Sequence, residues 1–109
     1  MLRSTWDDRI MIVAFSMSPG TSDETGSVSA AVAEVVRIVR ASGLPNETNS
    51  MFTNIEGEWD EVMAVVKQAV DAMTAISPRV SLVIKADIRP GYTGQLQAKV
   101  ERVEKHLAE

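Results

Sequence analysis

Residues 10–17 read IMIVAFSM, a dense apolar run with β-branched and aromatic members. The run is too short for an ordinary globular helix and is typical of a buried strand. Alternate residues of a strand point to opposite faces, and here both alternating sets are apolar. One set is Ile10, Ile12 and Ala14, and the other is Met11, Val13 and Phe15. We therefore expect a central strand that is covered on both faces of its sheet.

Two amphipathic helices are predicted in the middle of the chain. Apolar residues recur at helical spacing over residues 28–39 and again over residues 62–73. Ser27 is the predicted N-cap of the first helix, because its hydroxyl can accept a hydrogen bond from an exposed N–H of the first turn. Gly43 is the predicted residue after the C-terminus of that helix. The second helix follows a cluster of acidic residues and ends before Pro78.

Three more strands and a third helix complete the prediction. Residues 46–50 and 52–57 are two short strands joined by a tight turn. Residues 80–88 form the last strand, with one apolar face and one mixed face. The last helix is predicted from a narrow apolar stripe of Leu96, Val100, Val103 and Leu107.

This order of elements predicts an α+β fold, a ferredoxin-like βαββαβ sandwich with an extra C-terminal helix. Residues 1–9 are polar and unpatterned, so we assign them to an N-terminal lead-in and residues 10–109 to one domain. The strands at 10–17 and 52–57 are then central, and the first two helices cover one face of the sheet. The other face needs either the last helix folded back or a partner subunit, and we expect a homo-oligomer.

Composition excludes several classes of function. The 109-residue chain has no cysteine, which excludes disulfides and thiolate-bound metals and fits a reducing cytoplasm. The net charge is −4, and lysines and arginines form no cluster, so we expect no nucleic-acid partner. No apolar stretch approaches the ~20 residues that span a bilayer, and the start has no apolar signal region. We expect a cytoplasmic protein without a membrane partner.

The sequence offers little for catalysis or metal binding. His106 is the only histidine and lies near the end of the last predicted helix, where it complements the helix dipole. No nucleophile and base can be paired around it, and no carboxylate spacing matches a metal site. Residues 18–26, SPGTSDETG, precede a helix as phosphate loops do, but they lack the P-loop lysine and read as a solvated loop. We expect no catalytic residue, no metal, no cofactor and no enzymatic activity.

Glu56 is the most informative acid, because it lies in a predicted central strand next to a glycine. Alternation places Thr53 and Glu56 on opposite faces of this strand. Glu56 is either a dipole acid of the following helix or a carboxylate that accepts a hydrogen bond from a ligand. Trp59 is either a lid on the core or a stacking surface for a ring.

The last predicted strand carries the candidate interface. Lys85, Asp87 and Arg89 share its polar phase, either as a solvated face or as partners of an intersubunit salt bridge. We favour the interface, because the neighbouring strand at 10–17 is apolar. Val13 and Val83 are assigned to the same interface on the back of the sheet.

Four segments of the chain resemble the small thiamine-binding protein family, over about residues 12–107. They read SVSAAVAEVVRIVRASGLPNET, SMFTNIEGEWDEVMAVVKQAV, PRVSLVIKADIRPG and KVERVEKHL. The shared pattern is an S-V-S start to the first helix, a Gly-Leu exit, an M-G-T-x-x-E-G hairpin and an acid-x-Arg end to the last strand. The combination in this order is more specific than any one piece.

The resemblance implies a ferredoxin-like subunit that forms dimers or pairs of dimers. It also implies binding of thiamine or its hydroxymethylpyrimidine moiety without catalysis. Carried over to this chain, the motif residues assigned to the ligand are Ser27, Ser29, Met51, Thr53 and Glu56. We expect Glu56 to be the main polar anchor.

Phe52 departs from the family pattern, which usually has glycine there. A phenyl ring at this position either fills part of the pocket or stacks on a ligand ring, and we include Phe52 among the ligand contacts. The alternative function is a structural or regulatory oligomeric module without a small ligand, whose polar residues serve the interface.

Overall fold

The computed structural model describes residues 10–20 and 28–109, and its elements follow the predicted order. They are β1 (Ile10–Pro19), α1 (Ser29–Ala41), β2 (Asn46–Thr48), β3 (Thr53–Glu58), α2 (Trp59–Thr74), β4 (Val80–Ile88) and α3 (Gln95–Leu107). This arrangement confirms the ferredoxin-like α+β fold with an extra C-terminal helix. The predicted lead-in and the predicted N-cap Ser27 lie outside the described residues.

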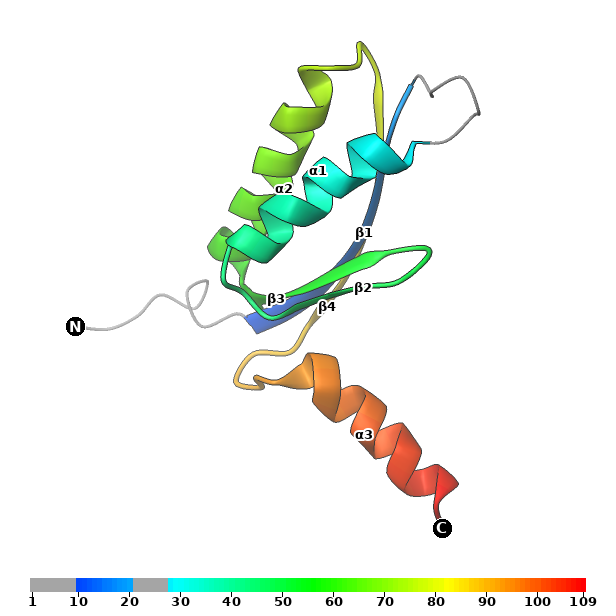
Figure 1. Ribbon diagram of the computed structural model, residues 1–109. Coiled ribbons are helices and arrows are strands. Elements are labelled where there is room, and N and C mark those ends of the chain that lie inside the picture. The colour runs from blue at the N-terminus through cyan, green and yellow to red at the C-terminus, as the bar shows by residue number, and fades with distance from the viewer. Residues whose placement is uncertain (1–9, 21–27) are drawn as a thin grey trace, which may run out of the picture.

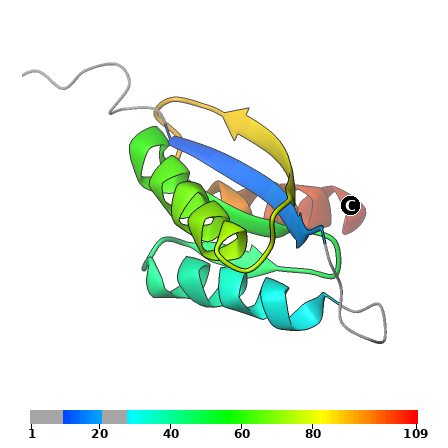
Figure 2. The ribbon, with the colours of Figure 1, turned by 90° about the horizontal axis from the view of Figure 1, so that it is seen from above.

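The strands form one antiparallel sheet in the order β2-β3-β1-β4, so β3 and β1 are the inner strands, as predicted. Helices α1 and α2 lie together on one face of this sheet, and α3 extends away on the other side (Figures 1 and 2). We refer to the side under α1 and α2 as the helix face and to the other side as the open face. None of the helices in the described part of the chain has the length and apolar content of a membrane-spanning segment.

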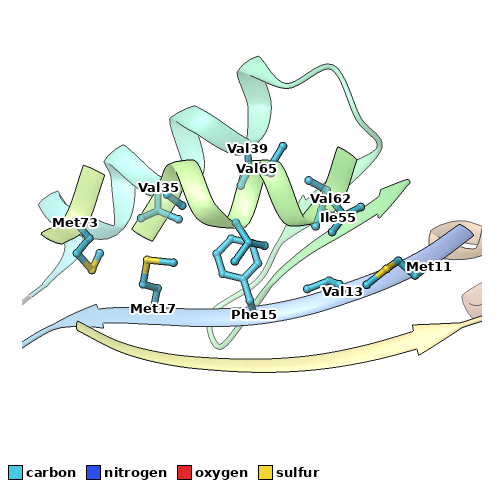
Figure 3. Packing of buried hydrophobic residues seen from close by; sticks show 12 residues of the cluster. Met11, Val13, Phe15, Met17, Val35, Val39, Ile55, Val62, Val65 and Met73 are labelled. Carbon is cyan, nitrogen blue, oxygen red and sulfur yellow. The ribbon is translucent and has the colours of Figure 1, made fainter. Parts of the chain in front are cut away.

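The core lies between the helix face and the two helices. Figure 3 shows the side chains that β1 points toward α1 and α2, which are Met11, Val13, Phe15 and Met17. They pack against buried residues of the other elements: Val35, Val39, Ile55, Val62, Val65, Val66, Ala69 and Met73. The opposite phase of β1 is only partly buried. An amphipathic stripe on each helix therefore covers one phase of β1, as the sequence predicts.

The prediction that Val13 belongs to an interface on the back of the sheet is wrong. The Val13 side chain is fully buried (0% exposed) among the core residues of the helix face, so it cannot belong to an interface on the open face. Both phases of β1 are apolar, and the phase that faces the helices is decided by pairing with the neighbouring strands. Val13 lies opposite Ile55 on β3 and Ala86 on β4, which fixes it to the helix face.

A glycine marks the end of α1, and the side chain of an asparagine shapes the turn of the hairpin. Helix α1 ends at Ala41, and Gly43 follows with a φ of 78°, a backbone conformation that favours glycine. Strand β2 is shorter than predicted, because the chain turns at Asn49. The Asn49 carboxamide oxygen accepts hydrogen bonds from the backbone N–H groups of Met51 and Phe52, both at 2.9 Å.

Strand β4 forms one edge of the sheet and is poorly covered. Within the described part of the chain its only strand neighbour is β1, and residues 81–88 are all exposed. The apolar residues concerned are Leu82, Val83, Ile84 and Ile88, with exposed fractions of 38%, 54%, 39% and 41%. An edge strand with apolar side chains on both faces is a surface that proteins normally cover.

Candidate functional site

Strand β3 divides the predicted ligand set between two faces of the sheet. Thr53 pairs with Phe15 of β1 and points to the helix face, whereas Glu56 pairs with Ile12 and points to the open face. Both side chains are nearly buried, with 6% of Thr53 and 4% of Glu56 exposed. The prediction that Glu56 shares one pocket with Thr53 is therefore wrong for a single subunit.

The other hairpin residues do come together. Met51, Phe52 and Thr53 line a pocket of about 210 Å³ between the β2–β3 hairpin, the end of β1 and the first turns of α1. We call it the hairpin pocket. Its remaining lining residues are Phe15, Ser16, Met17, Ser18, Val28, Val32, Val35, Thr48, Asn49 and Ser50.

The hairpin pocket combines apolar surface with neutral hydrogen-bonding groups. The hydroxyl oxygens of Thr48 and Thr53 lie 3.5 Å apart at its wall. Met51, at the tip of the hairpin, is 71% exposed and supplies a thioether at the pocket mouth. No charged side chain of the described residues lines this pocket. It therefore suits a flat, uncharged ring with polar groups at its edge.

Glu56 holds the start of α3 on the open face. Its carboxylate accepts a hydrogen bond from the backbone N–H of Gln95 at 2.8 Å and a longer one from that of Leu96 at 3.4 Å. The first N–H groups of a helix have no partner within the helix, and the dipole there favours a negative charge. The predicted role as a dipole acid thus applies to α3 and not to α2. The first turn of α2 is served by Glu61, whose carboxylate accepts from the Glu58 N–H at 3.2 Å.

The other residues considered in the sequence analysis lie outside the hairpin pocket or outside the described residues. Ser29 is exposed at the first position of α1 and does not line the hairpin pocket, and Ser27 lies outside the described residues. Trp59 is partly buried at the first position of α2 and packs against the core, which agrees with a lid. His106 is exposed near the end of α3, 3.8 Å from the Glu109 carboxylate. Within residues 10–20 and 28–109, no three metal-ligating side chains gather.

Two of the three predicted salt-bridge residues, Asp87 and Arg89, have partners within their own chain. Asp87 pairs with Lys99 of α3 at 2.5 Å. This contact lowers the pKa of Asp87 below its usual value, with smaller contributions from Arg89 and Lys85. The Arg89 guanidinium lies over the Tyr92 ring, 3.5 Å from its centroid. These contacts attach α3 and the following turn to the end of β4.

Two groups of pocket-lining residues were not predicted from the sequence. Thr48 and Asn49 line the hairpin pocket because the tight turn folds β2 back beside β3, and the predicted hairpin already implied that proximity. Lys99 and Arg102 lie near the end of β4 only because the N-terminal part of α3 is held against the open face. No local pattern in the sequence indicates that contact.

The chain is similar in sequence to known proteins. The sequence model described as thiamine-binding protein matches residues 13–104. A UPF0045 protein of Mycobacterium bovis is 52% identical over 99 residues, which cover 89% of this chain and 94% of the relative.

Solved structures share the fold. A hypothetical protein of Methanocaldococcus jannaschii has a TM-score of 0.78 and 25% identity, with 87% of this chain and 96% of that chain covered. A Thermotoga maritima protein, provisionally described as acting in thiamine biosynthesis or salvage, has a TM-score of 0.72 and 20% identity, with 84% of this chain and 98% of that chain covered.

Proposed function

We propose that this chain, which belongs to the thiamine-binding protein family, binds thiamine or its hydroxymethylpyrimidine moiety in the hairpin pocket and catalyses no reaction. The observation that carries the proposal is the gathering of Met51, Phe52 and Thr53 at one pocket. These three residues occupy the M-G-T part of the family motif. The proposal moves the ligand away from Glu56, whose carboxylate already accepts two backbone N–H groups of α3.

The lining of the hairpin pocket favours the pyrimidine half of the ligand. An aminopyrimidine is flat and carries hydrogen-bonding groups on its edge, so it needs an apolar surface for its face and neutral polar partners for its edge. Phe52 and the thioether of Met51 provide the first, and the hydroxyls of Thr48 and Thr53 provide the second. The thiazolium ring of thiamine is cationic, and no carboxylate among the described residues lines the pocket. We therefore expect hydroxymethylpyrimidine to account for most of the affinity.

The chemistry of the same residues supports a binding role without catalysis. The pocket offers hydroxyl, carboxamide and thioether groups but no acid, base or activated nucleophile among its described lining residues. We propose no cofactor. The cytoplasmic location expected from the sequence remains a prediction.

We also propose that the subunit forms a homo-oligomer through β4. Leu82, Val83 and Ile84 leave apolar surface exposed on both faces of this edge strand. Helix α3 adds the exposed apolar residues Val100, Val103 and Leu107. A second copy would cover surfaces that are costly to leave in water. The same surfaces support the second candidate function, an oligomeric interaction module without a small ligand.

Calorimetry with hydroxymethylpyrimidine and thiamine tests the ligand. We expect both to bind, and Thr53→Val to weaken each roughly two- to tenfold, because a net hydrogen bond between neutral groups contributes about 0.5–1.5 kcal/mol. Valine keeps the shape of the buried side chain, so the fold is retained. The matched control is Thr74→Val at the exposed end of α2, which should leave affinity unchanged.

Two results would count against this assignment. If neither compound binds the unmodified protein, the interaction module is the better description. If both bind but Thr53→Val has no effect, the ligand lies outside the hairpin pocket.

A further inference from the structure

A second pocket lies on the open face, away from the hairpin pocket. It occupies about 260 Å³ between the end of β4, the turn that follows and one side of α3. Three cationic side chains line it: Arg89 from the turn and Lys99 and Arg102 from α3. Ile10 and Ile12 of β1 contribute an apolar wall. We call this the basic pocket.

The two carboxylates in the basic pocket already have partners. Glu56 is 4% exposed and accepts hydrogen bonds from the N–H groups of Gln95 and Leu96. Asp87 is paired with Lys99. The pocket is lined by three cationic side chains and two acidic ones, and neither acid pairs with an arginine.

Both arginines keep hydrogen-bond donors available. Arg102 donates from Nη2 to the Gln95 carboxamide oxygen at 2.9 Å, which uses one of its five N–H groups. The guanidinium carbon of Arg89 lies 3.5 Å from the centroid of the Tyr92 ring, and such a cation–π contact uses none of the guanidinium N–H groups as donors to an oxygen. Among the described residues, no carboxylate forms an ion pair with either arginine. Donors of this kind, arranged in planar forks, match the oxygens of a phosphate group.

We propose that the basic pocket binds a small phosphate-class anion through Arg89, Arg102 and Lys99. The pocket of about 260 Å³ has room for inorganic phosphate or for a compact phosphorylated molecule, and the phosphate group is the chemistry that the two share. The site goes beyond the proposed pyrimidine binding, because the two pockets share no lining residue. Either proposal can therefore fail without the other.

Binding of the anion would fasten α3 to the sheet. Arg89 follows β4, whereas Lys99 and Arg102 belong to α3, so one phosphate group would bridge two elements. A ligand that binds only the docked arrangement stabilises it by mass action. We expect phosphate to slow amide hydrogen exchange in the first turns of α3.

The test is a titration of the full chain with inorganic phosphate and, separately, with glycerol 3-phosphate, at constant ionic strength maintained with chloride. Affinity is measured by calorimetry, and the site is located by NMR shifts of the Gln95 to Arg102 amides. Arg102→Gln should weaken binding about tenfold or more, because hydrogen bonds between charged groups are the stronger class. The matched control is Arg40→Gln in the last turn of α1, away from the basic pocket. It should change affinity less than about twofold, because a distant surface charge is largely screened.

The outcomes separate the possible sources of the anion. Tighter binding of glycerol 3-phosphate than of phosphate indicates a phosphorylated molecule, and the reverse order indicates free phosphate. Absence of binding to the unmodified protein would overturn the proposal, as would equal losses in Arg102→Gln and Arg40→Gln. It would also be overturned if Arg102→Gln changed only the oligomeric state, since the arginine would then serve a partner subunit. Circular dichroism of both variants checks that the fold is retained.

Discussion

Thr53 and Glu56 are close neighbours on β3, yet their side chains do different things. Thr53 points under the helices to the wall of the hairpin pocket, and Glu56 points to the open face, where it binds the first N–H groups of α3. Because successive strand residues alternate between faces, residues three apart never share one. Substitutions at these two positions should therefore affect different properties of the protein.

Glu56→Gln should loosen α3 and leave ligand affinity unchanged. Glutamine keeps the shape of the side chain but lacks the negative charge of the carboxylate, which accepts hydrogen bonds from two N–H groups in a buried site. The loss of that charge should reduce the free energy of α3 docking by about 1–3 kcal/mol. Hydrogen exchange at Gln95 and Leu96 measures the docking, and calorimetry with hydroxymethylpyrimidine measures the affinity.

Glu34→Gln is the matched control, because Glu34 is an exposed acid of α1, on the helix face of the sheet and away from α3. It should alter neither quantity. If Glu56→Gln instead weakened the pyrimidine and left α3 exchange unchanged, Glu56 would be a ligand residue after all.

Helix α3 is the element with the least support from the rest of the chain. No residue of α3 is buried, and the helix is attached near its N-terminus by Glu56 and along its side by the Asp87–Lys99 ion pair. Its apolar stripe, predicted from the sequence, remains exposed at Val100, Val103 and Leu107. The two attachments differ in kind, since one is a buried charged hydrogen bond and the other is a surface ion pair.

The Asp87–Lys99 pair should make stability depend on pH in acid. The pKa of Asp87 is lowered in the folded protein, chiefly by Lys99, so its contribution is fully present above the unfolded pKa of about 4. It disappears as the pH falls through the lower folded pKa. Both side chains are about half exposed (50% for Lys99 and 52% for Asp87), so solvent screening limits the contribution.

Urea denaturation of the unmodified protein and of Asp87→Asn from pH 6 to pH 2 measures this contribution. The difference in unfolding free energy should be about 0.2–1 kcal/mol above pH 5, as for other surface pairs, and should fall toward zero in acid and in high salt. A difference that stayed constant down to pH 2 would assign the effect of Asp87→Asn to something other than its charge.

At the scale of the whole molecule, the helices bury some strands of the sheet and leave others exposed to solvent. Helices α1 and α2 bury β1 and β3, whereas the edge strand β4 and most of α3 are left exposed (Figure 1). Apolar surface of this extent on an edge strand invites association with another copy. Lys85 and Val83 share the open face of β4, where a partner would meet them.

Val83→Glu should dissociate the homo-oligomer into folded subunits. Val83 is 54% exposed within one chain, so a glutamate there remains solvated in the subunit and is buried unpaired only in the assembly. Light scattering coupled to size-exclusion chromatography measures the mass, and circular dichroism confirms the fold. Gln68→Glu, on an exposed turn of α2, adds the same charge and should leave the mass unchanged. A monomeric unmodified protein would refute the proposed assembly.

Most of the fold could be predicted from local patterns. The apolar stripes of α1 and α2 and the run at 10–17 mark elements whose ends differ from the prediction by a few residues. Gly43 was identified as the residue after α1, because only a glycine takes its left-handed backbone without strain. Such features depend on neighbours within one or two turns of the chain, which is why sequence periodicity reveals them.

The roles of individual residues were predicted less well where they depend on distant contacts. The alternation of β3 already separated Thr53 from Glu56, but the motif resemblance grouped them as one ligand set. Val13 was assigned to the wrong face, because both phases of β1 are apolar and only strand pairing and helix packing choose between them. Glu56 binds the N-terminus of α3, 39 positions further along the chain. A contact over that separation leaves no periodic trace in the sequence, so only the tertiary structure determines it.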